Sequence, residues 1–175
     1  MHWGALPEVY HFEEDAQKKW FLQAYSQTYL NEEIWSEQLV RKLQPFRRFL
    51  EVAAQCSGKI INVANIARDV DCDEKTVRQY FSILEDTLLG FFLEPFSHSF
   101  RKRLSKKPKF YFFDLGVVRA LSGQLSIHAQ PRTDYYGDLF EHFIILECLK
   151  LNHYYHLEYR FSYIQTKDGA EEDLV

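Results

Sequence analysis

Apolar residues recur at helical spacing through the first part of the chain. They predict a first helix over residues 16–33. Its apolar positions are Trp20, Phe21, Tyr25 and Leu30. A second helix is predicted to begin near Pro45, because a proline loses no hydrogen bond in a first helical turn. It should stop before Ser57 and Gly58, a pair typical of helix ends.

Two further helices are predicted between residues 62 and 90. Asn62 can cap a short helix, and Asp73 can cap a longer one by accepting backbone N–H bonds. The inward positions are Val63, Ile66, Ala67 and Val70 in the short helix, and Val77, Phe81, Leu84 and Leu88 in the longer one. Gly90 is expected to end the longer helix. Two helices joined by such a short turn predict a helix-turn-helix unit.

The hydrophobic period then changes to that of strands. The segment FFLEPF, residues 91–96, is a short strand candidate, and residues 110–113 form a buried-looking strand. The basic stretch RKRLSKKPK, residues 101–109, connects them. Two strands with a basic connection behind a helix-turn-helix unit predict its winged form.

The rest of the chain reads as two helices and a hairpin. Asp114 can cap a short helix that Gly123 closes, and a long helix is predicted over residues 138–151. Its broad apolar face consists of Leu139, Phe140, Phe143, Ile144, Leu146 and Leu149. A hairpin with its turn at residues 167–169 completes the chain.

Composition narrows the function classes. Of the 175 residues 46% are hydrophobic, which favours a packed globule over disorder. The net charge of −4 gives no global nucleic-acid signature, so a basic function must be local. The cysteines Cys56, Cys72 and Cys148 are scattered, which indicates reduced thiols in a cytoplasmic protein. No apolar run approaches the roughly 20 residues of a membrane span, so no membrane partner is expected.

Local basic charge gathers on the predicted winged helix. The polar face of the second helix carries Lys75, Thr76, Arg78, Gln79 and Ser82. The wing adds Arg101, Lys102, Arg103, Lys106, Lys107 and Lys109. These residues predict contact with double-stranded DNA. Two alternatives stay open: the charge run is a solvated turn, or the winged helix packs against a protein partner. Four nearby carboxylates would repel DNA, and these are Asp69, Asp71, Asp73 and Glu74.

Carboxylates and histidines near the end of the chain raise the question of a metal site. Glu141 lies early in the long helix and Asp173 in the terminal strand, and nucleases hold Mg²⁺ with clustered carboxylates and a lysine. His153 and His156, with His142 upstream, also suggest a metal, but a helix end running into a strand there means that the two rings need not share a face. We therefore expect no metal, no cofactor and no catalytic residue, with Glu141 and Asp173 as vestigial candidates. The alternative is a Mg²⁺-dependent nuclease that another chain completes in trans.

Four stretches also carry a family resemblance. They are GALPEVY at residues 4–10, the segment NVANIARDVDCDEKTVRQYFSILEDTLLGFFLEPF, the segment KPKFYFFDLGVVRALSG, and GDLFEHFIILECLK together with DGAEEDLV. In this order they resemble the predicted AAA-type P-loop ATPases of bacteria and archaea, which carry a C-terminal domain of unknown function with a restriction-endonuclease-like core. The resemblance implies Glu141 on the first helix and Asp173 on the second strand of that core.

The sequence departs from this pattern in two places. The phosphate-binding loop G-x-x-x-x-G-K-[ST] is missing, since the only Gly-Lys pair, Gly58-Lys59, precedes Ile60. The Glu-x-Lys element of a third core strand is also missing. We therefore expect a chain truncated at both ends and without catalytic activity.

The predicted fold is α+β and mainly helical: a winged helix-turn-helix followed by an incomplete α/β restriction-endonuclease-like domain. Residues 1–44 form a helical segment after an absent ATPase core, residues 45–125 the winged helix, and residues 126–175 the truncated endonuclease-like part. The expected function is that of a remnant that binds DNA or a protein. A stand-alone winged-helix transcriptional regulator is a further alternative.

Overall fold

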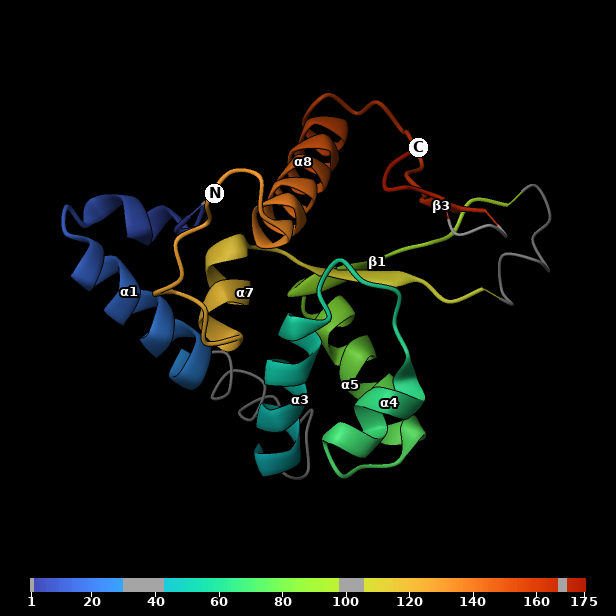
Figure 1. Cartoon of the computed structure of the whole chain (residues 1–175), viewed down its shortest axis with the longest axis horizontal. Helices are drawn as coiled ribbons and strands as arrows, with labels where there is room; N and C mark the ends of the chain where they lie inside the picture. Colours follow the sequence, from blue (N-terminus) through green and yellow to red (C-terminus); the bar gives the residue numbers. More distant parts are fainter. Residues whose placement is uncertain (1, 30–42, 98–105, 167–169) are drawn as a thin grey trace.

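The computed structural model describes residues 2–29, 43–97, 106–166 and 170–175. In these residues the chain is α+β and mainly helical, as predicted (Figure 1). Within the described part of the chain, no helix has both the length and the apolar character that crossing a membrane requires.

The N-terminal part is helical, but its inward face differs from the prediction. A short 3₁₀ turn, η1 (Pro7–His11), precedes α1 (Asp15–Ala24), which continues into the π-helical turn η2 (Tyr25–Tyr29). Trp20 was expected inside, yet it is 70% exposed. The buried position of α1 is Leu22, which packs with Val9 and Leu125. The predicted apolar position Leu30 lies outside the described residues.

Three helices form the main core. They are α3 (Leu43–Gln55), α4 (Val63–Asp69) and α5 (Glu74–Asp86). The two predicted caps are confirmed: Asn62 Oδ1 accepts the N–H of Asn65 at 3.4 Å, and Asp73 Oδ1 accepts the N–H of Thr76 at 2.8 Å. Aromatic rings from α3 and α5 meet edge to face in this core.

The end of α5 was predicted wrongly. The helix ends at Asp86, and Leu88 is 82% exposed with a φ of 59°, so it does not belong to the apolar face. Gly90 starts strand β1 (Gly90–Leu93) instead of ending a helix. A Cβ at this position would overlap with the ring of Phe110, which explains the glycine.

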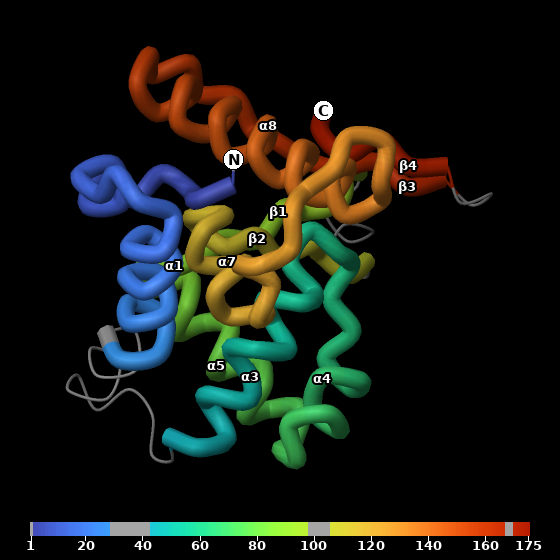
Figure 2. The backbone as a smooth tube through the Cα atoms, turned by 60° about the vertical axis from the view of Figure 1, so that its left-hand side comes forward, coloured from blue at the N-terminus to red at the C-terminus, as the bar shows by residue number. Residues whose placement is uncertain are grey.

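The strand pair β1 and β2 (Lys109–Phe112) lies between two layers of helices (Figure 2). The strands are antiparallel, and Gly90 pairs with Phe112. All four residues of β2 are buried. Phe110 and Phe112 belong to the core of α3 and α5, whereas Tyr111 belongs to a second cluster on the other face. One face of the strand thus packs against residues of the predicted region 45–125, and the other against residues of the predicted region 126–175.

The long helix α8 (Asp134–Tyr154) covers that second face. It contributes Ile145 to the cluster of Tyr111. Phe140 and Ile144, predicted as part of its apolar face, are 46% and 39% exposed, while His142 is buried. The helix therefore turns a different stripe toward the core than a count of apolar residues indicates.

The chain ends in a small hairpin beside these elements. Strand β3 (Ile164–Gln165) pairs with β4 (Glu171–Glu172), and the predicted turn at 167–169 lies outside the described residues. Farther along, Ser162 and Val175 exchange two backbone hydrogen bonds of 3.0 and 2.8 Å. Tyr163 therefore faces two residues, Asp173 and Leu174, which is a β-bulge. Tyr163 also bonds the backbone of Glu94 and Phe96, and this joins the hairpin to the extension of β1.

The N-terminus docks on α7 (Leu115–Leu121), the short helix that Asp114 caps as predicted. The Asp114 carboxylate accepts the N–H of Ala5 at 2.6 Å and that of Val117 at 3.0 Å. A Cβ on Gly116 would overlap with the Trp3 carbonyl. Two stretches that are far apart in sequence, GALPEVY and KPKFYFFDLG, are thus in direct contact.

Candidate functional site

The predicted DNA-facing residues of α5 lie on its outer side. Lys75, Arg78, Gln79 and Ser82 are exposed. Thr76 is half-buried, and its hydroxyl donates to Asp73 at 2.8 Å, so it belongs to the helix cap. Arg78 pairs with Glu74 at 3.1 Å across one helical turn. Such an exposed pair contributes only about 0.3–0.5 kcal/mol, so a phosphate can displace it.

A cavity of about 480 Å³ brings several of these residues together. It lies between α4, α5 and the strand pair, and its cationic lining consists of Arg78, Lys106 and Lys107. Ser82 adds a hydroxyl, and its apolar lining includes Phe81 and Phe92. Four residues that the sequence assigned to DNA binding therefore border one cavity. The wing residues Arg101, Lys102 and Arg103 lie outside the described part of the chain.

The predicted carboxylates also lie beside this surface. Asp69, Asp71 and Asp73 are exposed around the turn between α4 and α5. Hydrogen bonds from the backbone and side chain of Thr76 lower the pKa of Asp73. Asp73 is therefore charged at neutral pH and serves the helix as its cap.

Lys109 lies elsewhere than the sequence predicted. It was placed among the wing cations that face DNA, but it is the first residue of β2 and only 2% exposed. Its side chain follows the pleat of the strand toward α8 and the terminal hairpin, on the same face as Tyr111. It is not part of the DNA-facing surface.

A second polar site forms around the Lys109 ammonium. Its Nζ lies 3.3 Å from Glu141 Oε1 and 2.9 Å from Asp173 Oδ1, and it also pairs with Glu171. The Tyr111 hydroxyl donates to Glu141 at 2.6 Å. We call Lys109, Glu141, Glu171 and Asp173 the lysine cluster. It joins β2, α8 and β4, and so brings together the two predicted vestigial residues, Glu141 and Asp173.

Burial and charge act in opposite directions in the lysine cluster. Burial of the ammonium alone would lower the pKa of Lys109, but the bonds to Glu171 and Asp173 outweigh it, and the net pKa is raised. Burial raises the pKa of Glu141, although Tyr111 and Lys109 oppose that shift. Burial and the bond to Glu141 raise the pKa of Tyr111. The cluster is thus stable with a charged lysine and a protonated tyrosine.

The resemblance implies Mg²⁺ at Glu141 and Asp173, but the lysine cluster does not fit that ion as it is arranged. Carboxylate oxygens are suitable Mg²⁺ ligands. Here, however, all three carboxylates contact Lys109 Nζ, so the ammonium lies where they converge. Within the described ranges, no group of three or more His, Cys, Asp or Glu is arranged to hold a metal ion. We derive no catalytic step from this site.

Sequence reasoning missed the roles of Lys109 and Glu171. Two signals could have found them. Lys109 and Tyr111 alternate along a strand, and so do Glu171 and Asp173, which places each pair on one face of its strand. The histidine prediction concerned other positions: His142 is buried and lies 2.8 Å from the Phe112 carbonyl, while His153 and His156 are exposed.

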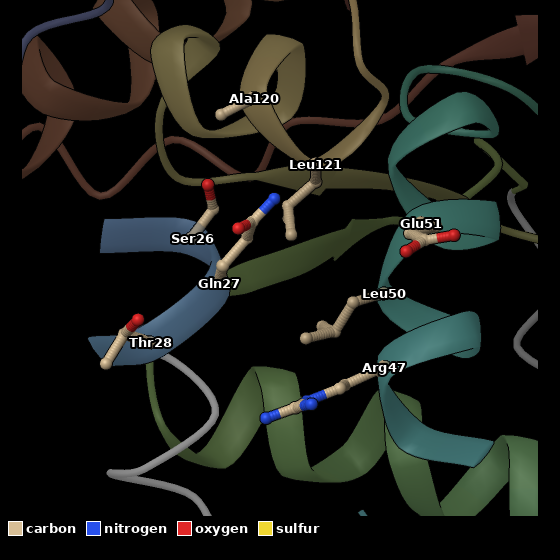
Figure 3. A pocket seen from close by; sticks show the side chains of 8 residues that line it. All are labelled: Ser26, Gln27, Thr28, Arg47, Leu50, Glu51, Ala120 and Leu121. Carbon is tan, nitrogen blue, oxygen red and sulfur yellow. The ribbon is translucent and has the colours of Figure 1, made fainter. Parts of the chain in front are cut away.

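Another cavity, of about 390 Å³, lies between η2, α3 and α7 (Figure 3). Its lining consists of Ser26, Gln27, Thr28, Arg47, Leu50, Glu51, Ala120 and Leu121. The sequence did not predict it. One arginine and one glutamate from the same helix line it, so its charge favours neither an anionic nor a cationic ligand.

Comparisons with known proteins place these sites in a wider context. A family model described as "Domain of unknown function (DUF8612)" matches residues 1–128, which include α4, α5 and β2 but not α8. The chain is 26% identical over 177 residues to "Uncharacterized protein Rv2008c" of Mycobacterium tuberculosis and to "Uncharacterized protein Mb2031c" of Mycobacterium bovis. The alignment covers 98% of this chain and 38% of each relative, so the chain spans about two fifths of their length. No solved structure matches.

Proposed function

The chain belongs to the family of domains of unknown function DUF8612, and we propose that it is a non-catalytic module that binds double-stranded DNA through α5 and the cations preceding β2. The observation that carries this proposal is the cavity shared by Arg78, Ser82, Lys106 and Lys107. These residues come from two separate segments, and the fold places their side chains around one opening.

The chemistry of this cavity suits a phosphate backbone. Arginine and lysine neutralise phosphates, and the serine hydroxyl is an additional hydrogen-bond donor. Arg78 and Gln79 on the exposed face of α5 have side chains able to reach base edges. The resemblance of this segment to the winged helix of AAA-type ATPases supports the same role. That the chain is a remnant of such an ATPase stays a prediction.

The carboxylates near the turn set a limit on affinity. Glu74 lines the cavity itself and Asp71 is exposed at the nearby turn, and their negative charge weakens attraction to DNA. The proposed binding is therefore weak and strongly dependent on salt. Cys56, Cys72 and Cys148 form no disulfide, and reduced cysteines support a cytoplasmic location.

Salt-dependent DNA binding tests the proposal. The logarithm of the binding constant falls with the logarithm of salt concentration by about 0.9 per phosphate contact. Replacing Arg78, Lys106 and Lys107 together by glutamine should lower this slope by roughly 2 to 3. The matched control is Lys150→Gln, which removes an exposed cation from α8 and should leave the slope unchanged.

Two results would decide against DNA. One is the absence of retained duplex in a filter-binding assay at low salt, which would leave a protein partner as the ligand of this surface. The other is the same change of slope per charge removed in the triple variant and in Lys150→Gln, that is, a change in Lys150→Gln about one third as large, which would mean that net charge alone drives binding.

A further inference from the structure

The lysine cluster holds the terminal hairpin against the body of the molecule. In the described part of the chain, the ion pairs of the terminal hairpin with other elements are those of Glu171 in β4, and of Asp173 just after β4, with Lys109. The bulge at Asp173 and Leu174 re-aims the strand at this point. One cation from β2 therefore holds the hairpin in place together with the backbone bonds of Tyr163 to Glu94 and Phe96.

Three carboxylates and one ammonium leave the cluster with an excess of negative charge. The side chains of Glu141, Glu171 and Asp173 are 25%, 30% and 49% exposed, whereas that of Lys109 is 3% exposed. Lys109 Nζ lies 5.5 Å from the centroid of the Tyr163 ring, which adds a cation–π contact. Without a cation at this position, the carboxylates of α8 and β4 would repel one another.

We propose that Lys109 is the resident cation of this site: its ammonium takes the position at which a divalent metal ion would otherwise join Glu141, Glu171 and Asp173. As a structural metal ion would, the lysine joins β4 to α8 and β2 through its ion pairs. It also excludes a metal ion from the site. This inference does not depend on the proposed DNA binding, which involves other residues.

The geometry supports this substitution of one cation by another. A bound divalent ion gathers oxygen ligands from several elements, and the lysine cluster gathers them from α8 and β4 in the same manner. Tyr111 directs its hydroxyl to Glu141 and so fixes the orientation of that carboxylate. In the described ranges these carboxylates do not form a metal site as they stand, so a metal ion binds only if they close around the position that the ammonium vacates. Their oxygens are the hard donors that Mg²⁺ and Mn²⁺ prefer.

The test compares the native protein with Lys109→Met, which keeps a side chain of similar length without its charge. Mn²⁺ binding is measured by equilibrium dialysis, and thermal unfolding is measured in EDTA and in MnCl₂. The native protein should melt at the same temperature in both solutions. Lys109→Met should melt lower in EDTA, recover in MnCl₂, and bind Mn²⁺ at least about tenfold more tightly than the native protein.

Matched variants locate the effect. Lys109→Arg retains a cation and should show no Mn²⁺ response. Adding Glu171→Gln to Lys109→Met removes one carboxylate and should abolish most of the gain. If Lys109→Met does not fold in EDTA, refolding in MnCl₂ replaces the melting measurement: recovery supports the proposal, and continued failure overturns it. Native-protein binding of Mn²⁺ that Glu141→Gln abolishes would also overturn it, because the ammonium would then not exclude the metal.

Discussion

The buried His142 makes a specific prediction about stability and pH. Its side chain is only 3% exposed, and its Nε2 lies 2.8 Å from the Phe112 carbonyl oxygen. Because a carbonyl only accepts hydrogen bonds, Nε2 carries the proton and donates. Burial lowers the pKa of His142 from 6.5 to about 4, against the opposing effect of the Phe112 bond. The native ring is therefore neutral at pH 7.

The sign of the pH effect follows from this lowered pKa. Between pH 6.5 and about 4 the unfolded chain binds a proton at His142 that the native protein does not bind. Above pH 6.5 His142 is neutral in both states, and burying it costs the native protein nothing in protonation. As the pH falls from 6.5 to about 4, the unfolded chain takes up the proton and the free energy of unfolding decreases. One pKa unit corresponds to about 1.36 kcal/mol, so the complete loss is roughly 3 kcal/mol. The side chain is almost fully buried, so solvent screening removes little of this.

Urea unfolding between pH 4 and 8 measures the effect. His142→Gln retains a donor for Phe112 but cannot titrate, so it should be less stable than the native protein at pH 7 and lose less stability on acidification. The difference between the two proteins isolates His142, because the lysine cluster and other carboxylates titrate in both. The control is His153→Gln at an exposed position of α8. A difference between native protein and His142→Gln that stays constant from pH 7 to 4 would refute the reasoning.

Two further predictions concern the docking of the N-terminus on α7, and urea unfolding measures both. Gly116→Ala should cost about 1–3 kcal/mol, because its Cβ would overlap with the Trp3 carbonyl, whereas Gly137→Ala in α8 has nothing within 4 Å and should gain up to about 1 kcal/mol. Equal effects of the two changes would contradict the close contact. Arg119 is fully buried and donates to the Tyr135 hydroxyl and to the backbone carbonyls of His2 and Gln124. Arg119→Met should therefore cost about 3 kcal/mol or more, and Arg119→Lys should recover only part of this; full recovery would show that charge alone matters.

The local features of the fold could be predicted because their causes are local. Asn62, Asp73 and Asp114 were expected to cap helices, and each accepts a backbone N–H three residues onward. A cap needs only its own side chain and the next turn, so the sequence contains all the information. The buried strand at residues 110–113 was also visible, since an apolar run flanked by polar residues suits a strand buried on both faces.

Helix faces and helix ends were less predictable, because they depend on neighbours. Trp20 and Leu88 are apolar and occur at helical spacing, yet both are exposed. Spacing shows which residues share a face, but it does not say whether another element covers that face. Gly90 was interpreted as a helix end, although the strand needs it because the Phe110 ring leaves no room for a Cβ.

In the candidate sites, too, some features could be predicted from local sequence, whereas others depend on tertiary packing. The sequence by itself determined that α5 has a polar outer face with Arg78 and Ser82, because helical spacing assigns these positions. Only the tertiary structure separated Lys109 from its neighbours Lys106 and Lys107. These three belong to one basic run, but the pleat of β2 turns Lys109 inward to carboxylates 32 and 64 residues away. A sequence identifies a charged residue but not the side to which its side chain points. For Lys109, the packing of α8 and the terminal hairpin on β2 decides that.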